Sequence, residues 1–205
     1  MNRYTTVAKE AEAEQVIDRS RFIAHIAEVH SKEEADAFIA RVRAQYKDAT
    51  HNVPAFIVGE KGELKWTSDD GEPQGTSGPP MLQMLEREGL TNVVCVVTRY
   101  FGGIKLGTGG LVRAYTSSAK LALEAAGTHT VKDVTHMRVT VPYTLLGKLQ
   151  NLEKSEPFAI ADITYTENVS LDLTMDLEDE ERVNALLLEV SSGTASIGEV
   201  EHLVE

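Results

Sequence analysis

The sequence has one cysteine, one tryptophan and no long hydrophobic run. Because Cys95 is alone it cannot form an internal disulfide, and its apolar neighbours predict a reduced core thiol rather than a nucleophile. The longest strongly apolar run, residues 93–97, is far too short to cross a membrane. The first residues lack the basic and apolar blocks of a secretory signal. We therefore expect a cytoplasmic protein that makes no membrane contact.

Positive charge is scarce in the last third of the chain. The formal net charge is −12. Residues 1–133 carry 16 Lys and Arg against 18 Asp and Glu, a balance of −2, whereas residues 134–205 carry 4 against 14, a balance of −10. Since non-specific nucleic-acid affinity comes mostly from neutralised phosphates, the second segment is a poor candidate for binding RNA or DNA. Only a local basic site in the first segment could do so.

The second segment has a regular pattern of elements. Residues 137–141 and 169–175 alternate strictly between apolar and polar, which predicts half-buried strands. Apolar residues at helical spacing follow both. The predicted strands are residues 137–141, 160–165, 169–175 and 197–204, and the predicted helices are residues 144–154 and a segment that begins near residue 178. This β-α-β-β-α-β order predicts a ferredoxin-like domain over residues 134–205.

The first segment predicts a separate α+β domain over residues 1–130. Ser31 and Glu34 form a capping-box pattern at the start of a helix with one apolar stripe. Residues 68–78 form a polar loop. The other predicted elements are strands at residues 11–17, 22–29, 53–58, 63–67 and 92–98, a short helix after Pro79, and a helix over residues 108–126. We expect the domain boundary near residues 128–134 and a fold of two α+β domains.

A glycine-rich loop links the last strand of the first domain to its last helix. In RYFGGIKLGTGGLVRAY, residues 99–115, Thr108 stands where a Walker loop needs lysine. Val112 stands where a dinucleotide fingerprint starting at Gly107 needs glycine. Neither nucleotide motif is present. Alternatively, the glycines only permit positive φ and close packing of helix against sheet.

The same loop can still bind an anion. Thr108 is a candidate helix N-cap, which would leave the amides of Gly109 and Gly110 facing outward. Arg99, Lys105 and Arg113 lie nearby in the sequence and would contact phosphate. Upstream, Gly75 and Thr76 form a second Gly-Thr loop that also leads into a helix. Two helix N-termini would then converge on one site.

The loop that carries Gly75 is rich in acids. Asp69, Asp70 and Glu72 invite a metal hypothesis, but Pro80 stands where an EF-hand needs its last glutamate, so that calcium site is excluded. Magnesium held by one or two of these carboxylates is an open alternative to salt bridges with the neighbouring cations. We expect no metal site or cofactor.

One histidine and one aromatic pair complete the candidates. His51 could be a general base with a carboxylate behind it, although a buried or capping role is the structural alternative. Tyr100 and Phe101 either belong to the core or form an exposed stacking surface for single-stranded RNA. The strand at residues 169–175 has no aromatic residue, so the second domain lacks the RNP strand of an RRM.

These motifs carry a family resemblance. DDGEPQGTSGPPML (residues 69–82) and VVTRYFGGIKLGTGGLVRAY (residues 96–115), preceded by SRFIA and ATHN, resemble the IMPACT family and its short bacterial YigZ-like members. Such members combine a UPF0029 N-terminal domain with a small DUF1949-type C-terminal domain. Val53 departs from the family pattern, which has cysteine there, and this argues against thiol chemistry at that position. We expect no RWD module of the kind found in the eukaryotic chains.

The resemblance implies a fold for each domain and a cellular process in which the protein acts. It implies that the first domain is like the second domain of a ribosomal small-subunit protein, and like domain IV of elongation factor G. It implies that the second domain is like domain V of that factor. Our leading hypothesis is therefore a non-enzymatic factor linked to translation regulation that contacts RNA or the ribosome. The alternatives are an enzyme acting on a phosphorylated small molecule or nucleotide, and a regulator that binds another protein. The sequence gives no prediction of whether the protein is a monomer or an oligomer.

Overall fold

The computed structural model describes residues 2–205 and divides them into two compact units. The first unit is Tyr4–Thr130, and the second is residues 131–205 with Asn2 and Arg3. The division falls inside one long strand, β7 (Thr128–Val141), which pairs with β1 (Asn2–Val7). The sequence pattern missed β1. Two domains built on antiparallel sheets confirm the predicted α+β class.

The first unit contains a five-stranded antiparallel sheet in the order β2-β3-β6-β4-β5. Its strands are β2 (Ala11–Ile17), β3 (Ser20–Glu28), β4 (His51–Val58), β5 (Leu64–Thr67) and β6 (Val93–Tyr100). Its helices are α1 (Lys32–Gln45), α2 (Gly78–Arg87) and α3 (Gly107–Ala126).

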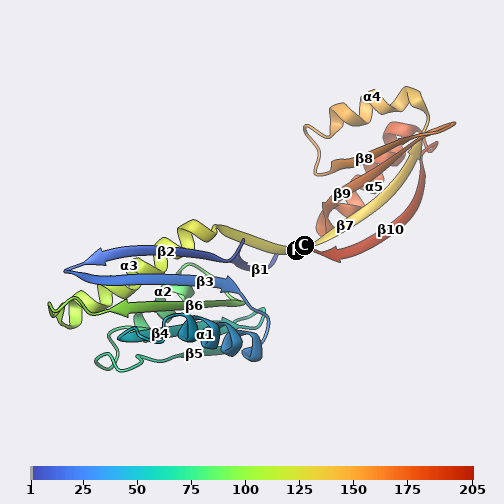
Figure 1. Ribbon diagram of the computed structural model, residues 1–205. Coiled ribbons are helices and arrows are strands. Elements are labelled where there is room, and N and C mark those ends of the chain that lie inside the picture. The colour runs from blue at the N-terminus through green and yellow to red at the C-terminus, as the bar shows by residue number, and fades with distance from the viewer. Residues whose placement is uncertain (1) are drawn as a thin grey trace. The chain divides into compact units, whose positions relative to one another are not determined.

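Helices cover both faces of this sheet (Figure 1). Core residues of α1 pack with Val94 and Val96 of β6, whereas those of α2 and α3 pack with Cys95 and Val97. This explains why residues 93–97 form an uninterrupted apolar run, since a central strand covered on both faces has no solvent side. Burial raises the pKa of the Cys95 thiol to about 12, as expected for a core thiol.

The N-terminus of α1 has the predicted cap. The Ser31 hydroxyl accepts a hydrogen bond from the Glu34 amide at 3.1 Å. The Glu34 carboxylate in turn accepts from the amide of His30 at 2.7 Å, one residue before the N-cap. The helix therefore begins where the capping box predicts.

The second unit contains the predicted β-α-β-β-α-β order. After β7 come α4 (Tyr143–Leu152), β8 (Ala159–Tyr165), β9 (Val169–Asp176), a short 3₁₀ turn η1 (Leu177–Asp179), α5 (Glu180–Ser191) and β10 (Ser196–Val204). The strands pair in the spatial order β10-β7-β9-β8. Alternation along β9 puts Val169, Leu171 and Leu173 into a core shared with α4 and α5.

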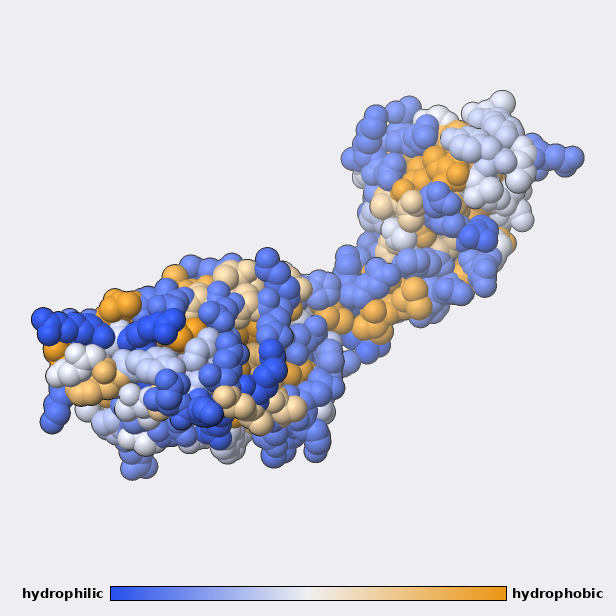
Figure 2. All heavy atoms as spheres, viewed as in Figure 1, coloured by the Kyte–Doolittle hydropathy of each residue, from blue (hydrophilic) through white to orange (hydrophobic). Residues whose placement is uncertain are grey.

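The surface of the first unit is mixed in character. On its visible face, hydrophobic residues form small groups separated by hydrophilic ones (Figure 2). None of the helices within residues 2–205 is both long enough and apolar enough to cross a membrane.

Candidate anion-binding site

The candidate site lies where β6 ends and the glycine-rich loop turns toward α3. Gly102 lies so close to the hairpin between β2 and β3 that a Cβ atom there would overlap the backbone carbonyl of Arg19. Gly103 and Gly107 have φ values of +85° and +70°, a region that favours glycine. These three glycines shape the loop, whereas Gly109 and Gly110 have no positive φ and lie in the first turn of α3.

A buried ion pair lies beneath this loop. Arg99 is only 4% exposed, and its Nη1 donates to Glu72 Oε1 at 2.6 Å. The hydroxyl of Tyr115 donates to the same oxygen at 2.7 Å, and Arg99 Nη2 donates to the Ser20 hydroxyl at 3.2 Å. Burial and the neighbouring carboxylate raise the pKa of Tyr115 strongly, so its hydroxyl stays protonated. The salt-bridge alternative is confirmed for Glu72 and Arg99.

One donor of this arginine lacks an acceptor. Arg99 Nε is buried and has no hydrogen-bond partner among residues 2–205. The centre of the guanidinium lies 5.5 Å from the ring of Phe22 and 5.4 Å from the ring of Phe101. Phe22 is fully buried, whereas Phe101 is 47% exposed. Phe101 therefore covers a strongly polar group from the solvent side.

His51 joins the same polar cluster. Its Nδ1 lies 2.8 Å from the backbone oxygen of Asp70, which can only accept, so Nδ1 carries a proton. Its Nε2 lies 3.7 Å from Glu72 Oε1. The Asp70 carboxylate accepts from the Asn52 amide and pairs with Arg43 at 3.1 Å. The structure thus brings together His51, Asp70 and Glu72, but Asp70 does not pair with the cations of the glycine-rich loop.

The first Gly-Thr loop is already occupied by a side chain of the protein. The Asp69 carboxylate accepts from the amides of Gly75 at 2.7 Å, Ser77 at 3.1 Å and Gly78 at 3.0 Å, and from the Ser77 hydroxyl. Burial opposes ionisation of Asp69, but these hydrogen bonds outweigh it and lower its pKa. The hydroxyl of Thr76 donates to the Pro73 carbonyl. The expectation that both Gly-Thr loops offer free helix amides to one anion is wrong at α2.

The second Gly-Thr loop differs. α3 begins at Gly107 with Leu106 as its N-cap, and no side chain within residues 2–205 accepts a hydrogen bond from the first amides of this helix. Thr108 therefore lies inside the helix, and its predicted role as N-cap is wrong. The helix begins two residues earlier than it would with a threonine cap, at Gly107, whose positive φ favours glycine.

A pocket of about 360 Å³ lies beside this uncapped helix end. Of the residues singled out in the sequence, it brings together Arg99, Phe101, Lys105, Thr108 and Glu72. The other lining residues are Pro73, Leu106, Gly107 and Leu111. They have no polar side-chain group, so the sequence did not mark them as binding residues. The remaining candidates do not line it: His51, Asp69, Asp70, Gly75, Thr76, Tyr100, Gly109, Gly110 and Arg113.

The cationic and aromatic residues of this region differ in exposure and in whether their side chains have partners. Lys105 and Arg113 are exposed and have no carboxylate partner within the described residues 2–205. Tyr100 is half-buried, its hydroxyl donates to Asp48 at 2.9 Å, and the Arg21 guanidinium lies over its ring. Phe101 alone of the aromatic pair is largely exposed.

The described residues contain no cluster of side chains that could bind a metal ion. Among residues 2–205, no three His, Cys, Asp or Glu side chains are placed to hold one ion together. The carboxylates of Asp69 and Asp70 accept hydrogen bonds from backbone amides, as described above.

Comparison with known proteins places the chain in a family. IMPACT family member YvyE of Bacillus subtilis is 39% identical over 201 residues, which cover 98% of this chain and 93% of that protein. The model of the Impact N-terminal domain matches residues 18–123. The chain belongs to the IMPACT family. The model of a domain of unknown function, DUF1949, matches residues 139–194, so the predicted two-part membership is confirmed.

Two further relatives of this IMPACT family chain span nearly its whole length. IMPACT family member YigZ of Escherichia coli is 34% identical over 187 residues, 90% of this chain and 92% of that protein. A solved structure described as a hypothetical protein has 32% identity and a TM-score of 0.62, and the match covers 98% of both chains. The Impact N-terminal match includes every residue that lines the pocket.

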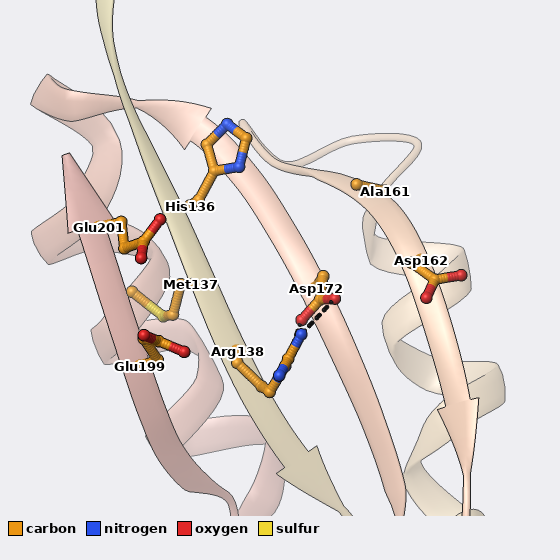
Figure 3. Close-up of a pocket in the computed structure, with 8 residues that line it drawn as sticks. All are labelled: His136, Met137, Arg138, Ala161, Asp162, Asp172, Glu199 and Glu201. Carbon is orange, nitrogen blue, oxygen red and sulfur yellow. Dashed lines mark hydrogen bonds and ion pairs between the residues drawn. The ribbon is translucent and has the colours of Figure 1, made fainter. Parts of the chain in front are cut away.

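A second pocket, of about 270 Å³, lies on the open face of the sheet in the second unit (Figure 3). Four of its eight lining residues are acidic. The Arg138 guanidinium donates from Nε and Nη2 to the two oxygens of Asp172 at 2.7 and 2.9 Å, which neutralises the arginine. Asp162, Glu199 and Glu201 remain around it, so this face repels an anion.

Proposed function

We propose that this chain is a non-catalytic factor, linked to translation regulation, which contacts RNA or the ribosome through the loop face of its first unit. The observation that carries the proposal is the pocket beside the N-terminus of α3, which is lined by exposed Phe101 and by Lys105, a cation without a carboxylate partner among residues 2–205. Backbone amides and a lysine attract phosphate, and an exposed ring can stack on a base.

The fold assignments of the two units belong to the same proposal. We assign the first unit to the class of the second domain of a ribosomal small-subunit protein. We assign the second unit to the ferredoxin-like class, which its strand order β10-β7-β9-β8 supports. Fold alone is a weak guide to activity, so the proposal depends on the pocket.

The distribution of charge supports an RNA contact at the first unit rather than the second. The open sheet face of the second unit carries Asp162, Glu199 and Glu201 around a neutralised arginine. Phosphates would be repelled there, and we assign this face to solvent or to a protein partner. Within the first unit we assign the attraction for RNA to Lys105 of the loop and to Arg113 of α3.

The test is co-sedimentation of the full chain with ribosomes, with and without RNase. Lys105→Glu with Arg113→Glu should abolish co-sedimentation while the protein stays folded, because both side chains are exposed. Lys120→Glu is the matched control, since Lys120 is an exposed residue further along α3. Unchanged co-sedimentation of the folded double variant would reject the proposal.

A second candidate function is catalysis on a phosphorylated small molecule. The observation that favours it is that the Glu72 carboxylate lines the pocket and has His51 3.7 Å away. A carboxylate and a histidine at this distance can exchange protons with a bound ligand. Turnover of a phosphorylated metabolite that is lost in His51→Gln would favour the enzyme over the RNA factor.

A further inference from the structure

We infer that the pocket beside α3 binds the terminal phosphate monoester of a single nucleotide unit, either free or at the end of an RNA. For the RNA source this inference rests on the proposed function. It goes beyond that function because contact along an RNA backbone needs no terminal phosphate.

The N-termini of α2 and α3 differ in whether the chain itself supplies an anion. At α2, the Asp69 carboxylate accepts three amide hydrogen bonds, so that helix end has its anion within the chain. At α3, a helix of 20 residues, no side chain of the described part of the chain, residues 2–205, caps the end. The partial positive charge of a long helix N-terminus therefore faces the pocket through Gly107 and Thr108.

An independent observation comes from the buried arginine. Arg99 lines the same pocket and is more than nine-tenths buried, yet its Nε has no acceptor within residues 2–205. Buried N–H groups of folded proteins are nearly always hydrogen-bonded. The ring centroid of Phe101, a residue that is 47% exposed, lies 5.4 Å from the centre of the same guanidinium. An anion oxygen in the pocket would supply the missing acceptor.

The charge balance of the pocket favours a phosphate over a neutral ligand. Glu72 neutralises Arg99, so the attraction comes from Lys105 and the helix end, and Arg99 adds a directional donor. A phosphate monoester carries a charge of about −1.5 to −2 at neutral pH and offers three acceptor oxygens. An internal phosphodiester carries only one charge and offers two unsubstituted oxygens, so this site would attract it less strongly.

The apolar wall suggests what the phosphate is attached to. The apolar part of the lining consists of Pro73, Phe101, Leu106 and Leu111. The charged residues of the lining are the three already named, Glu72, Arg99 and Lys105. A pocket of about 360 Å³ is at the small end of the range for small-molecule sites. One nucleobase with its sugar matches this volume, and the exposed ring of Phe101 can stack on the base.

The experiment compares ligands that differ only in the terminal phosphate. Adenosine 5′-monophosphate is set against adenosine in a thermal-shift titration of the full chain. A short single-stranded RNA with a 5′-phosphate is set against the same RNA with a 5′-hydroxyl by fluorescence anisotropy. We expect the phosphate to improve affinity about tenfold or more, as charge-assisted hydrogen bonds do.

Two variants separate the pocket from the rest of the surface. Lys105→Met should bring the affinity ratio of phosphorylated to unphosphorylated ligand close to one, whereas Lys120→Met, an exposed residue of the same helix, should leave it unchanged. Arg99 is not substituted, because it belongs to the buried ion pair.

The outcomes distinguish this inference from the proposed function. Equal affinity for both RNAs, with equal stabilisation by adenosine and its monophosphate, overturns the inference and leaves RNA binding intact. Stabilisation by the monophosphate alone, without RNA binding, supports the inference and overturns the proposed function. A ratio that stays high in Lys105→Met also overturns the inference.

Discussion

Nη1 of Arg99 lies 2.6 Å from Oε1 of Glu72, and both side chains are buried. This pair joins the last residues of β6 to the loop between β5 and α2, two segments far apart in the sequence. It also means that Arg99 is not a free cation. The charge that attracts an outside phosphate therefore comes from Lys105, Arg113 and the N-terminus of α3, whereas Arg99 contributes only the donor at its Nε.

The ion pair predicts a large stability loss on removal of one charge. Glu72→Gln leaves Arg99 buried without its compensating charge, which should lower the free energy of unfolding by about 3–5 kcal/mol. Urea denaturation of the wild type and the variant measures this difference in the free energy of unfolding. The control is Glu86→Gln, since Glu86 pairs with Lys65 at an exposed site, where the loss should be below about 1 kcal/mol. Equal losses in the two variants would contradict the account.

The Asp69 cap predicts a pH-dependent contribution. Asp69→Asn should destabilise the protein by about 1–3 kcal/mol at pH 7, because three amides and a hydroxyl lose a charged acceptor. The folded-state pKa of Asp69 is lowered, so its stabilisation is present above the unfolded pKa of about 4 and is lost as pH falls through the folded-state value.

Urea titrations of wild type and Asp69→Asn at several pH values check this. The difference between them should be constant near neutrality and shrink below about pH 4. Asp36→Asn, at an exposed residue paired with Lys32, serves as the control and should change stability by only a few tenths of a kcal/mol, roughly. A difference that grows as the pH falls would reverse the predicted sign.

The glycines of the loop predict opposite effects on stability. Gly102→Ala places a Cβ against the backbone of Arg19 and should cost about 1–3 kcal/mol. Gly109→Ala meets only the end of the Arg113 side chain, at 3.7 Å, and should stabilise α3 by about 0.5–1 kcal/mol. Thermal unfolding of the two variants tests the distinction. A destabilised Gly109→Ala would show that this glycine is required by the fold.

Much of the fold could be predicted from periodicity. Strict alternation located β9, and a capping box located the start of α1, because both signals are local. β1 was missed because its pairing with β7 lies more than 120 residues away in the sequence. The sequence wrongly predicts a cap at Thr108 because residue type alone does not show that Gly107 has a positive φ.

The site was predicted only in part. The sequence singled out Arg99, Lys105 and Phe101, but it did not show which acid would neutralise Arg99. It treated the two Gly-Thr loops as equivalent, although Asp69 already fills one helix end. Tyr115 and Ser20 complete the buried cluster through their hydroxyl groups. Both residues lie within the quoted motifs, and this was the signal that could have identified them.

The most direct measurement is the salt dependence of RNA affinity for the full chain and its Lys105→Glu, Arg113→Glu variant. For a single-stranded RNA, log K should fall linearly with log salt concentration in the wild type. The slope of the variant should be shallower by about 1 to 2, because two phosphate contacts are lost, with a weaker affinity at every salt concentration. Identical slopes and affinities in the two folded proteins would contradict the assignment of RNA contact to this loop.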